Sequence, residues 1–247
     1  RAYFRDFREK ERDIRTCISL DFIHWTEPRF LDYAPRRINQ LYTNAVIPYY
    51  RAPHIFLGFP ARYVDHDWDA STWKLPQPEL RDRVSSSLRR RGSVTHDTML
   101  MISRDGQHFD MWPESFIRPG IQRPGSWFYG DTRQNWGLVE TKSKFDGAPD
   151  EISVYVNEGR FQPEGTRLRR YTLRVDGFVS VHAPLSGGEM ITKPVIFSGS
   201  SLEVNFSTSA GGNIRAELQT PEGSPLPGFC LADCQPQFGD ELARTIT

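Results

Sequence analysis

A short turn motif, Ser-x-Asp-x-x-x-aromatic, occurs twice in this chain and constrains its fold more than any other feature. The two copies are Ser19–Trp25 and Ser103–Phe109, and an eroded third copy spans Arg174–Phe178. Each copy follows a run whose composition predicts a strand, and each leads into another short strand. A hairpin that recurs in this way indicates a repeat, and in an all-β chain it favours a β-propeller, whose blades have four strands each.

The motif also gives a register for the other strands, if it links the third and fourth strand of each blade. The chain then holds the end of one blade, a blade from Gln40 to Arg118 and a blade from Ser126 to Ser186. A propeller needs at least about four blades, so we expect a partial propeller whose N-terminal blades are missing. The predicted strands are Ala2–Arg5, Arg15–Ser19, Thr26–Leu31, Leu41–Ile47, His54–Arg62, Thr98–Ser103, His108–Trp112, Trp136–Ser143, Glu151–Asn157, Leu168–Arg174 and Phe178–His182.

From Gly187 onwards the pattern changes to short strands joined by tight glycine turns. The predicted strands there are Met190–Phe197, Leu202–Ser207, Asn213–Gln219, Phe229–Ala232 and Ala243–Ile246. Closely spaced strands of this kind favour a β-sandwich. The predicted organisation is therefore all-β, with a propeller domain over residues 1–186 and a truncated sandwich over residues 187–247.

Composition excludes several classes of protein. The 31 basic and 31 acidic residues balance, so neither a nucleic acid nor an anionic membrane is an expected partner. No apolar run approaches the roughly 18 residues of a membrane span. The three cysteines have no disulfide or zinc spacing. Aromatic residues form 13% of the chain, which suits both strands and sugar-binding clefts.

The segment Ser19–Pro28 resembles a blade hairpin of the five-bladed propeller glycoside hydrolases, families 32 and 43. The second copy, Ser103–Phe109, is similar to the Asp boxes of sialidases but is one residue shorter. A propeller followed by a sandwich is also the layout of family 32. The resemblance implies cleavage of a poly- or oligosaccharide and a secreted or periplasmic location. The Trp-Met-Asn-Asp-Pro-like, Arg-Asp-Pro and Glu-Cys motifs of family 32 do not occur in this sequence.

Glycoside hydrolysis needs two carboxyl groups that flank the scissile bond, one of them protonated near neutral pH. The blade register places Asp131, Glu140 and Asp97 toward the usual ligand side of a propeller. Glu140 follows an apolar run, where burial would raise its pKa. The alternatives are a loop-capping role for Asp131, an arginine partner for Glu140 and an ordinary turn role for Asp97. The aspartates of the repeated turns lie on the opposite side, and their predicted role is to fix the turns.

The remaining predicted site residues would bind the sugar. They are Arg62, Tyr42, Asn44, Trp127 and His96. A non-catalytic carbohydrate-binding propeller stays open as an alternative. So does a sialidase-like enzyme, for which Arg36, Arg37 and Arg62 would supply part of an arginine cluster.

The long connection from Tyr63 to His96 carries an acidic run, Asp65–Asp69, and a short predicted helix, Pro78–Arg90. A loop of this length in a compact domain is usually functional or disordered. Clustered carboxylates are the ligands that calcium prefers, but the run lacks the glycine and the spacing of a calcium-binding loop. No metal or cofactor is therefore predicted, and calcium remains the one alternative.

Overall fold

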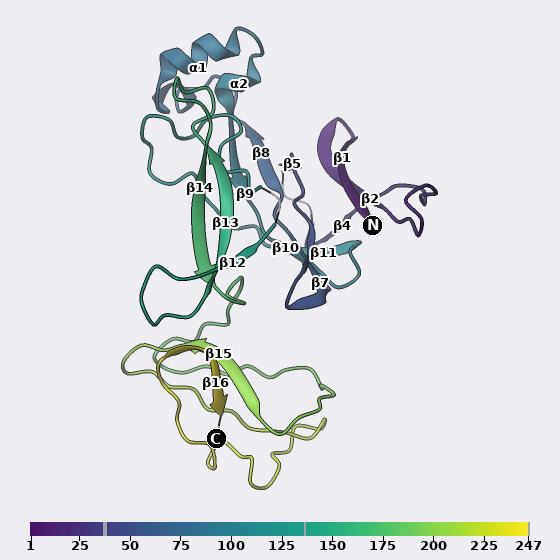
Figure 1. The fold of residues 1–247 in the computed structure, drawn as a ribbon, viewed down its shortest axis with the longest axis vertical. Coiled ribbons are helices and arrows are strands. Elements are labelled where there is room, and N and C mark those ends of the chain that lie inside the picture. Colours follow the sequence, from purple (N-terminus) through teal and green to yellow (C-terminus); the bar gives the residue numbers. More distant parts are fainter. Residues whose placement is uncertain (37–38, 136, 247) are drawn as a thin grey trace. The chain divides into compact units, whose positions relative to one another are not determined.

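The computed structural model describes residues 1–36, 39–135 and 137–246, and it is mostly β, with 36% of its residues in strands and few in helices (Figure 1). It divides into two compact units. The first comprises residues 1–139 and 153–171, and the second residues 140–152 and 172–247. The domain boundary expected near residues 185–188 lies inside the second unit. Among the described residues, no helix is long and apolar enough to cross a membrane.

The first unit opens with a hairpin, β1 (Ala2–Arg8) and β2 (Glu11–Cys17), which pairs with β3 (Arg29–Phe30). The predicted strands Ala2–Arg5 and Arg15–Ser19 fall largely within β1 and β2. Only the short β3 forms within the predicted strand Thr26–Leu31. Ser19 lies beyond β2, where an isolated bridge to Trp25 closes the first copy of the turn motif.

The predicted middle blade forms a four-stranded antiparallel meander with one addition. The strands are β6 (Ile47–Tyr49), β7 (Ala52–Gly58), β10 (Met101–Ser103) and β11 (His108–Met111). Neighbours along the meander pair antiparallel. A fifth strand, β4 (Asp32–Ala34), pairs parallel with β11. The order of this five-stranded sheet is therefore β4-β11-β10-β7-β6.

Three predicted strands of that blade are interrupted and continue into a second sheet. The order of this sheet is β5 (Gln40–Leu41), β8 (Ala61–Asp65), β9 (Val94–Thr98). Phe59 and Pro60 separate β7 from β8, and a proline has no N–H group to continue a ladder. The predicted strands Leu41–Ile47, His54–Arg62 and Thr98–Ser103 are therefore each shared between the two sheets.

The main core cluster of the first unit takes residues from both of these sheets and from β2. Seven buried apolar residues form one cluster: Ile14, Leu31, Leu41, Val46, Met101, Phe109 and Met111. The connection between β8 and β9 contains a 3₁₀ turn (Thr72–Lys74) and two helices, α1 (Pro78–Ser85) and α2 (Arg90–Ser93), which contact each other. The helix predicted over Pro78–Arg90 is thus confirmed in its first two turns.

The third predicted blade has three strands in the structure. Its sheet is ordered β12 (Val139–Thr141), β13 (Glu151–Glu158), β14 (Arg167–Arg174) (Figure 1). The start of the predicted strand Trp136–Ser143 lies outside the described residues. The predicted fourth strand, Phe178–His182, is wrong: this segment is a turn and an irregular stretch, and its valines are exposed.

In the second unit, β15 (Leu202–Ser207) pairs antiparallel with β16 (Asp240–Ile246). The first matches its predicted bounds, and the second contains the predicted strand Ala243–Ile246. The strands predicted over Met190–Phe197, Asn213–Gln219 and Phe229–Ala232 do not form, and only isolated bridges occur at Ile214 and Gln219. Most large apolar side chains of this unit are exposed. They therefore lack the packing that would stabilise these segments as strands.

Candidate functional site

The two copies of the turn motif form equivalent internal hydrogen bonds. In the second copy, Asp105 Oδ1 accepts from the N–H groups of Gln107 and His108, at 2.7 and 2.8 Å. Its Oδ2 lies 2.6 Å from His108 Nδ1. In the first copy Asp21 bonds in the same way to Ile23 and His24. The structural role predicted for these aspartates is therefore confirmed, and neither copy is a candidate catalytic site.

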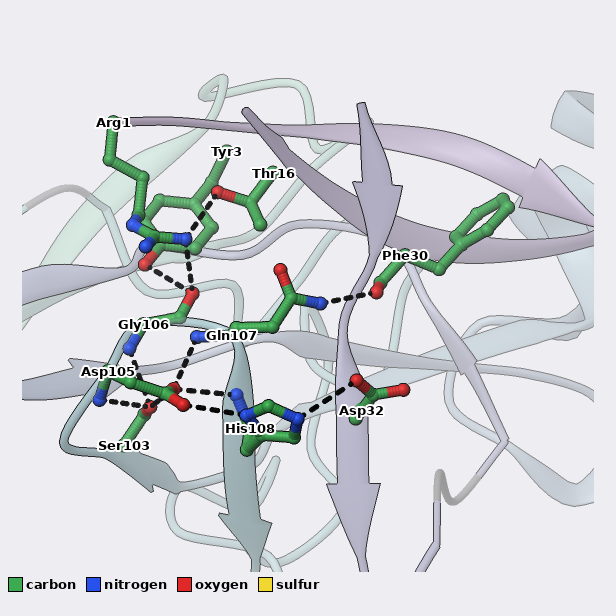
Figure 2. Close-up of polar contacts among 10 residues, drawn as sticks. All are labelled: Arg1, Tyr3, Thr16, Phe30, Asp32, Ser103, Asp105, Gly106, Gln107 and His108. Atoms are coloured by element: carbon green, nitrogen blue, oxygen red, sulfur yellow. Dashed lines mark hydrogen bonds and ion pairs between the residues drawn. The ribbon is translucent and has the colours of Figure 1, made fainter. Parts of the chain in front are cut away.

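The second turn is anchored to the rest of the first unit, as Figure 2 shows. The Gly106 carbonyl accepts from the Tyr3 hydroxyl at 2.8 Å and from Arg1 at 3.2 Å. His108 Nε2 lies 3.4 Å from a carboxylate oxygen of Asp32, because β4 and β11 pair in register there. The hydrogen bond and the charge of Asp105, with a smaller contribution from Asp32, raise the pKa of His108.

Asp97 and Arg62 form a half-buried ion pair with two hydrogen bonds across β8 and β9. Arg62 Nε donates to Asp97 Oδ1 at 2.8 Å and Nη2 donates to Oδ2, which also accepts from the Ser115 hydroxyl. Arg62 also donates to the Pro113 carbonyl. Both predicted residues therefore have partners of their own, and this pair serves to join the strands.

The strand register separates that pair from the other predicted residue of β9. Arg62 pairs with Asp97, and Tyr63 with His96. Successive side chains of a strand point to opposite faces, so His96 and Tyr63 lie on one face, and Asp97 and Arg62 on the other. Arg62 and His96, which were both predicted to bind the sugar, therefore lie on opposite faces of the sheet. His96 lies on the face that contacts the loop carrying Asp131.

Asp131 is buried, with 3% of its surface exposed, and its oxygens accept from two backbone groups. Oδ2 accepts from the Phe128 N–H at 3.0 Å and Oδ1 from the Arg160 N–H at 3.2 Å. This is the loop-capping arrangement that the sequence left open. Burial nevertheless outweighs these bonds and raises the pKa of Asp131 to about 6.

Glu140 and Trp127 differ from their expected settings. Glu140 is exposed in β12 and belongs to the second unit, so the burial expected from the preceding apolar run is wrong. Trp127 is half-buried, and its indole N–H donates to the Gly120 carbonyl at 2.9 Å. That bond ties the Trp127 ring to its own loop.

Tyr42 and Asn44 line a wide, solvent-open cavity of about 450 Å³ in the first unit. Its remaining wall is formed by Tyr3, Arg5, Thr43, Ala45, Gln134 and Asn135. Gln134 is 4% exposed, and neither its amide nitrogen nor its amide oxygen has a hydrogen-bond partner in the described structure. Buried polar atoms are nearly always paired, so this carboxamide is an exception that needs a reason. We call this cavity the Tyr42 pocket.

An aromatic cluster adjoins the Tyr42 pocket. The rings of Tyr42, Tyr63, His96 and Tyr129 lie with their centroids 5.2–6.3 Å apart. The Tyr129 and Tyr42 hydroxyls are 3.0 Å apart and share a hydrogen bond. Burial raises the pKa of Tyr63 to about 12. Burial would also raise the pKa of Tyr42, but its Tyr129 and Arg5 hydrogen bonds and nearby arginine charge lower it.

His96 is held neutral inside this cluster. Its Nδ1 accepts from the Gly130 N–H at 2.9 Å, so the proton resides on Nε2, which has no partner in the described part of the chain. Burial, followed by the charges of Arg133, Arg12 and Arg160, lowers the pKa of His96 to about 3. His96 is therefore a hydrogen-bond donor at every physiological pH.

Sequence reasoning missed Gln134, Asn135 and Arg5. The two amides follow Asp131 in a loop whose strand pattern is weak, and Arg5 looks like any exposed strand residue. Of the arginines proposed for a sialidase-like cluster, Arg62 is paired with Asp97, Arg36 is exposed, and Arg37 lies outside the described residues.

The acidic run after β8 is occupied by internal contacts. Asp65 accepts from the Ser93 hydroxyl, Asp67 pairs with Arg89, and Asp69 accepts from the Thr72 N–H. Among the described residues, no three His, Cys, Asp or Glu side chains gather as metal ligands. The calcium alternative thus has no geometric support in that part of the chain.

No family model, curated protein or solved structure matches this chain. The Tyr42 pocket and its surroundings are therefore the features of the chain that indicate its function.

Proposed function

We propose that the first unit is a carbohydrate-binding propeller segment that holds a sugar in the Tyr42 pocket. The observation that carries the proposal is the buried, unpartnered carboxamide of Gln134 in the pocket wall. A sugar hydroxyl both donates and accepts, so it can pair with the nitrogen and the oxygen of an amide. Asn44 and Asn135 supply two further amides, and Tyr3 and Tyr42 supply aromatic surface. Few polar groups on an aromatic wall are typical of a small-molecule site.

The blade order β6-β7-β10-β11 supports the propeller half of this proposal. A sandwich over residues 187–247, and a secreted or periplasmic location where polysaccharides occur, belong to the same proposal. Non-catalytic binding fits better than hydrolysis because Asp97 is paired with Arg62 and Asp131 is capped by backbone N–H groups.

The decisive variant is Gln134→Leu, which keeps the side-chain size but removes the polar atoms. Because both atoms lack partners, the free energy of unfolding should stay level or rise. Binding of the best ligand in a panel of neutral oligosaccharides, measured by calorimetry, should fall at least about tenfold. Gln219→Leu, the same change in the second unit, is the matched control. Unchanged affinity in the stable Gln134→Leu protein would contradict the proposal.

Hydrolysis is the second candidate, and one observation favours it. A pKa of about 6 leaves a minor fraction of the Asp131 carboxyl protonated near neutrality, and a general acid must act in its protonated form. The test is hydrolysis of chromogenic aryl glycosides by the wild-type chain and by Asp131→Asn. Turnover that disappears in the folded variant would support hydrolysis, and absence of turnover in the wild type would exclude it for these substrates.

A further inference from the structure

Four arginine side chains surround the hydrogen-bonded pair Tyr42–Tyr129. The guanidinium carbons of Arg5, Arg133 and Arg12 lie 4.5, 5.2 and 5.6 Å from the centroid of the Tyr42 ring. That of Arg160 lies 5.4 Å from the Tyr129 ring. Arg12 is buried, Arg133 and Arg160 are half-buried, and Arg5 lines the Tyr42 pocket. We call these four residues the arginine group.

Three members of this group, Arg5, Arg133 and Arg160, have no ion pair among the described residues. Within the described chain, Arg5, Arg133 and Arg160 have no carboxylate oxygen within 4 Å, whereas arginines such as Arg8 and Arg62 do. Arg133 Nε donates to the Gly130 carbonyl at 3.1 Å, and Arg5 donates to the Tyr42 carbonyl at 3.4 Å.

Asp131 attracts Arg133, but a single carboxylate charge does not balance the charges of Arg5, Arg133 and Arg160. Asp65 and Arg90 also act on Tyr63, and their charges are opposite. Arg12 donates to the Gln40 side-chain oxygen at 2.6 Å, a neutral acceptor.

Gly130 allows two of these arginines to converge. Its φ is +87°, and a Cβ there would lie 2.6 Å from Arg133 Nη2 and 2.8 Å from Arg160 Cδ. Two guanidinium groups brought together at a half-buried place repel each other, and their approach costs free energy unless an anion joins them. Burial and the neighbouring Arg160 lower the pKa of Arg133, which agrees with an excess of positive charge.

We propose that the arginine group binds a compact oxyanion, a carboxylate or a sulfate, carried by an acidic sugar in the Tyr42 pocket. The planar guanidinium forks of Arg133 and Arg160 match the paired oxygens of such a group. Tyr42 and the amides of Asn44 and Gln134 then contact the sugar ring and its hydroxyls. The identity of the ligand rests on the proposed function, whereas the oxyanion site itself stands without it.

The first experiment measures the oxyanion site alone, with inorganic sulfate as the probe. The melting temperature of the full chain is compared in sodium sulfate and in sodium chloride of equal ionic strength. Sulfate also stabilises proteins nonspecifically, so the same comparison is made for Arg133→Gln, Arg160→Gln and the exposed helix control Arg83→Gln. A bound ion adds a saturable stabilisation, which we expect in the wild type and in Arg83→Gln only. An equal response in all four proteins overturns the oxyanion site.

The second experiment compares acidic and neutral sugars by calorimetry. The pairs are oligogalacturonate with its methyl ester, and glucose 6-sulfate with glucose, so the two arms distinguish a carboxylate from a sulfate. We expect one acidic member to bind at least about tenfold more tightly than its neutral partner, and Arg133→Lys to lose most of that preference.

The outcomes separate the two proposals. If neutral and acidic sugars bind equally, the inference fails and the proposed function stands. If sulfate binds through Arg133 and Arg160 but no sugar binds, the oxyanion site stands and the carbohydrate assignment fails. If neither sulfate nor any sugar binds, both are overturned.

Discussion

The two copies of the turn motif have the same internal hydrogen bonds and very different surroundings. In Ser19–Trp25 the aromatic residue is Trp25, 40% exposed, with its indole N–H bonded to Phe22 within the turn. In Ser103–Phe109 the aromatic residue is Phe109, 1% exposed and part of the main core cluster. Local sequence therefore sets the geometry of the turn, and the packing around it decides how much stability the turn contributes.

The aromatic position should show the largest difference between the copies. Phe109→Ala removes a ring that packs in the core and meets Tyr3 edge-on at 6.4 Å, so it should cost about 3–5 kcal/mol of unfolding free energy. Trp25→Ala removes a half-exposed ring and should cost no more than about 1 kcal/mol. Chemical denaturation of both variants measures the two values, and equal costs would mean that the first turn is anchored as firmly as the second.

The left-handed position of the second turn should show the next largest effect. Gly106 has a φ of +74°, and a Cβ there would lie 2.5 Å from the Tyr3 hydroxyl oxygen. Gly106→Ala should cost about 2 kcal/mol or more, from backbone strain and from this clash. Adding Tyr3→Phe removes the obstructing oxygen, so the cost of the alanine should shrink in that background. A cost that is independent of Tyr3 would contradict the anchoring role of this contact.

His108 should make the second turn sensitive to pH. Asp105 and Asp32 raise its pKa above the ordinary value of 6.5. The protonated form is favoured in the folded state, so the stabilisation is present below pH 6.5 and is lost as the pH rises through the folded pKa. His108→Gln should therefore destabilise the protein more at pH 5.5 than at pH 8.5.

An NMR titration of the His108 ring measures the same property directly. Its midpoint should lie above 6.5 and should fall in Asp105→Asn, with a smaller decrease in Asp32→Asn. An unchanged midpoint in Asp105→Asn would show that the pair is not formed in solution.

The smallest effect is expected at Phe22, the residue of the first turn that corresponds to Gly106. Phe22 has a φ of +61°, which is costly for a residue with a Cβ. Phe22→Gly removes this strain but loses the edge-on contact with Trp25 at 5.9 Å and adds freedom to the unfolded chain. We expect a net gain of about 0.5 kcal/mol. A loss larger than that would mean that the Phe22–Trp25 contact holds the exposed turn together.

Several predictions from the sequence concerned local structure, and the structure agrees with them. The aspartate bonds of the two turns, the strand Leu202–Ser207 and the helix beginning at Pro78 depend on neighbours close in the chain. The predicted strands that do not form have a common cause. Phe178–His182 and Met190–Phe197 have the composition of strands, but no strand within the described residues pairs with them.

The candidate site could be predicted only in part, because its residues come from segments that are far apart in the sequence. Tyr42 and His96 were named from the sequence, but their neighbours Arg5, Arg12 and Gln134 come from three other segments. Asp97 was placed on the same side as His96, and the alternation along β9 puts it on the other face, against Arg62.

The sequence alone determined that this chain is mostly β and that a Ser-x-Asp turn repeats within it, because both properties arise from residues a few positions apart. Only the tertiary structure decided which buried polar groups have no hydrogen-bond partner and which charged side chains lie close together. Gln134 is unpaired and the arginine group is assembled because sheets formed from distant segments enclose them. Burial and proximity in space set the cost of a polar group, and neither can be read from a residue's neighbours in the chain.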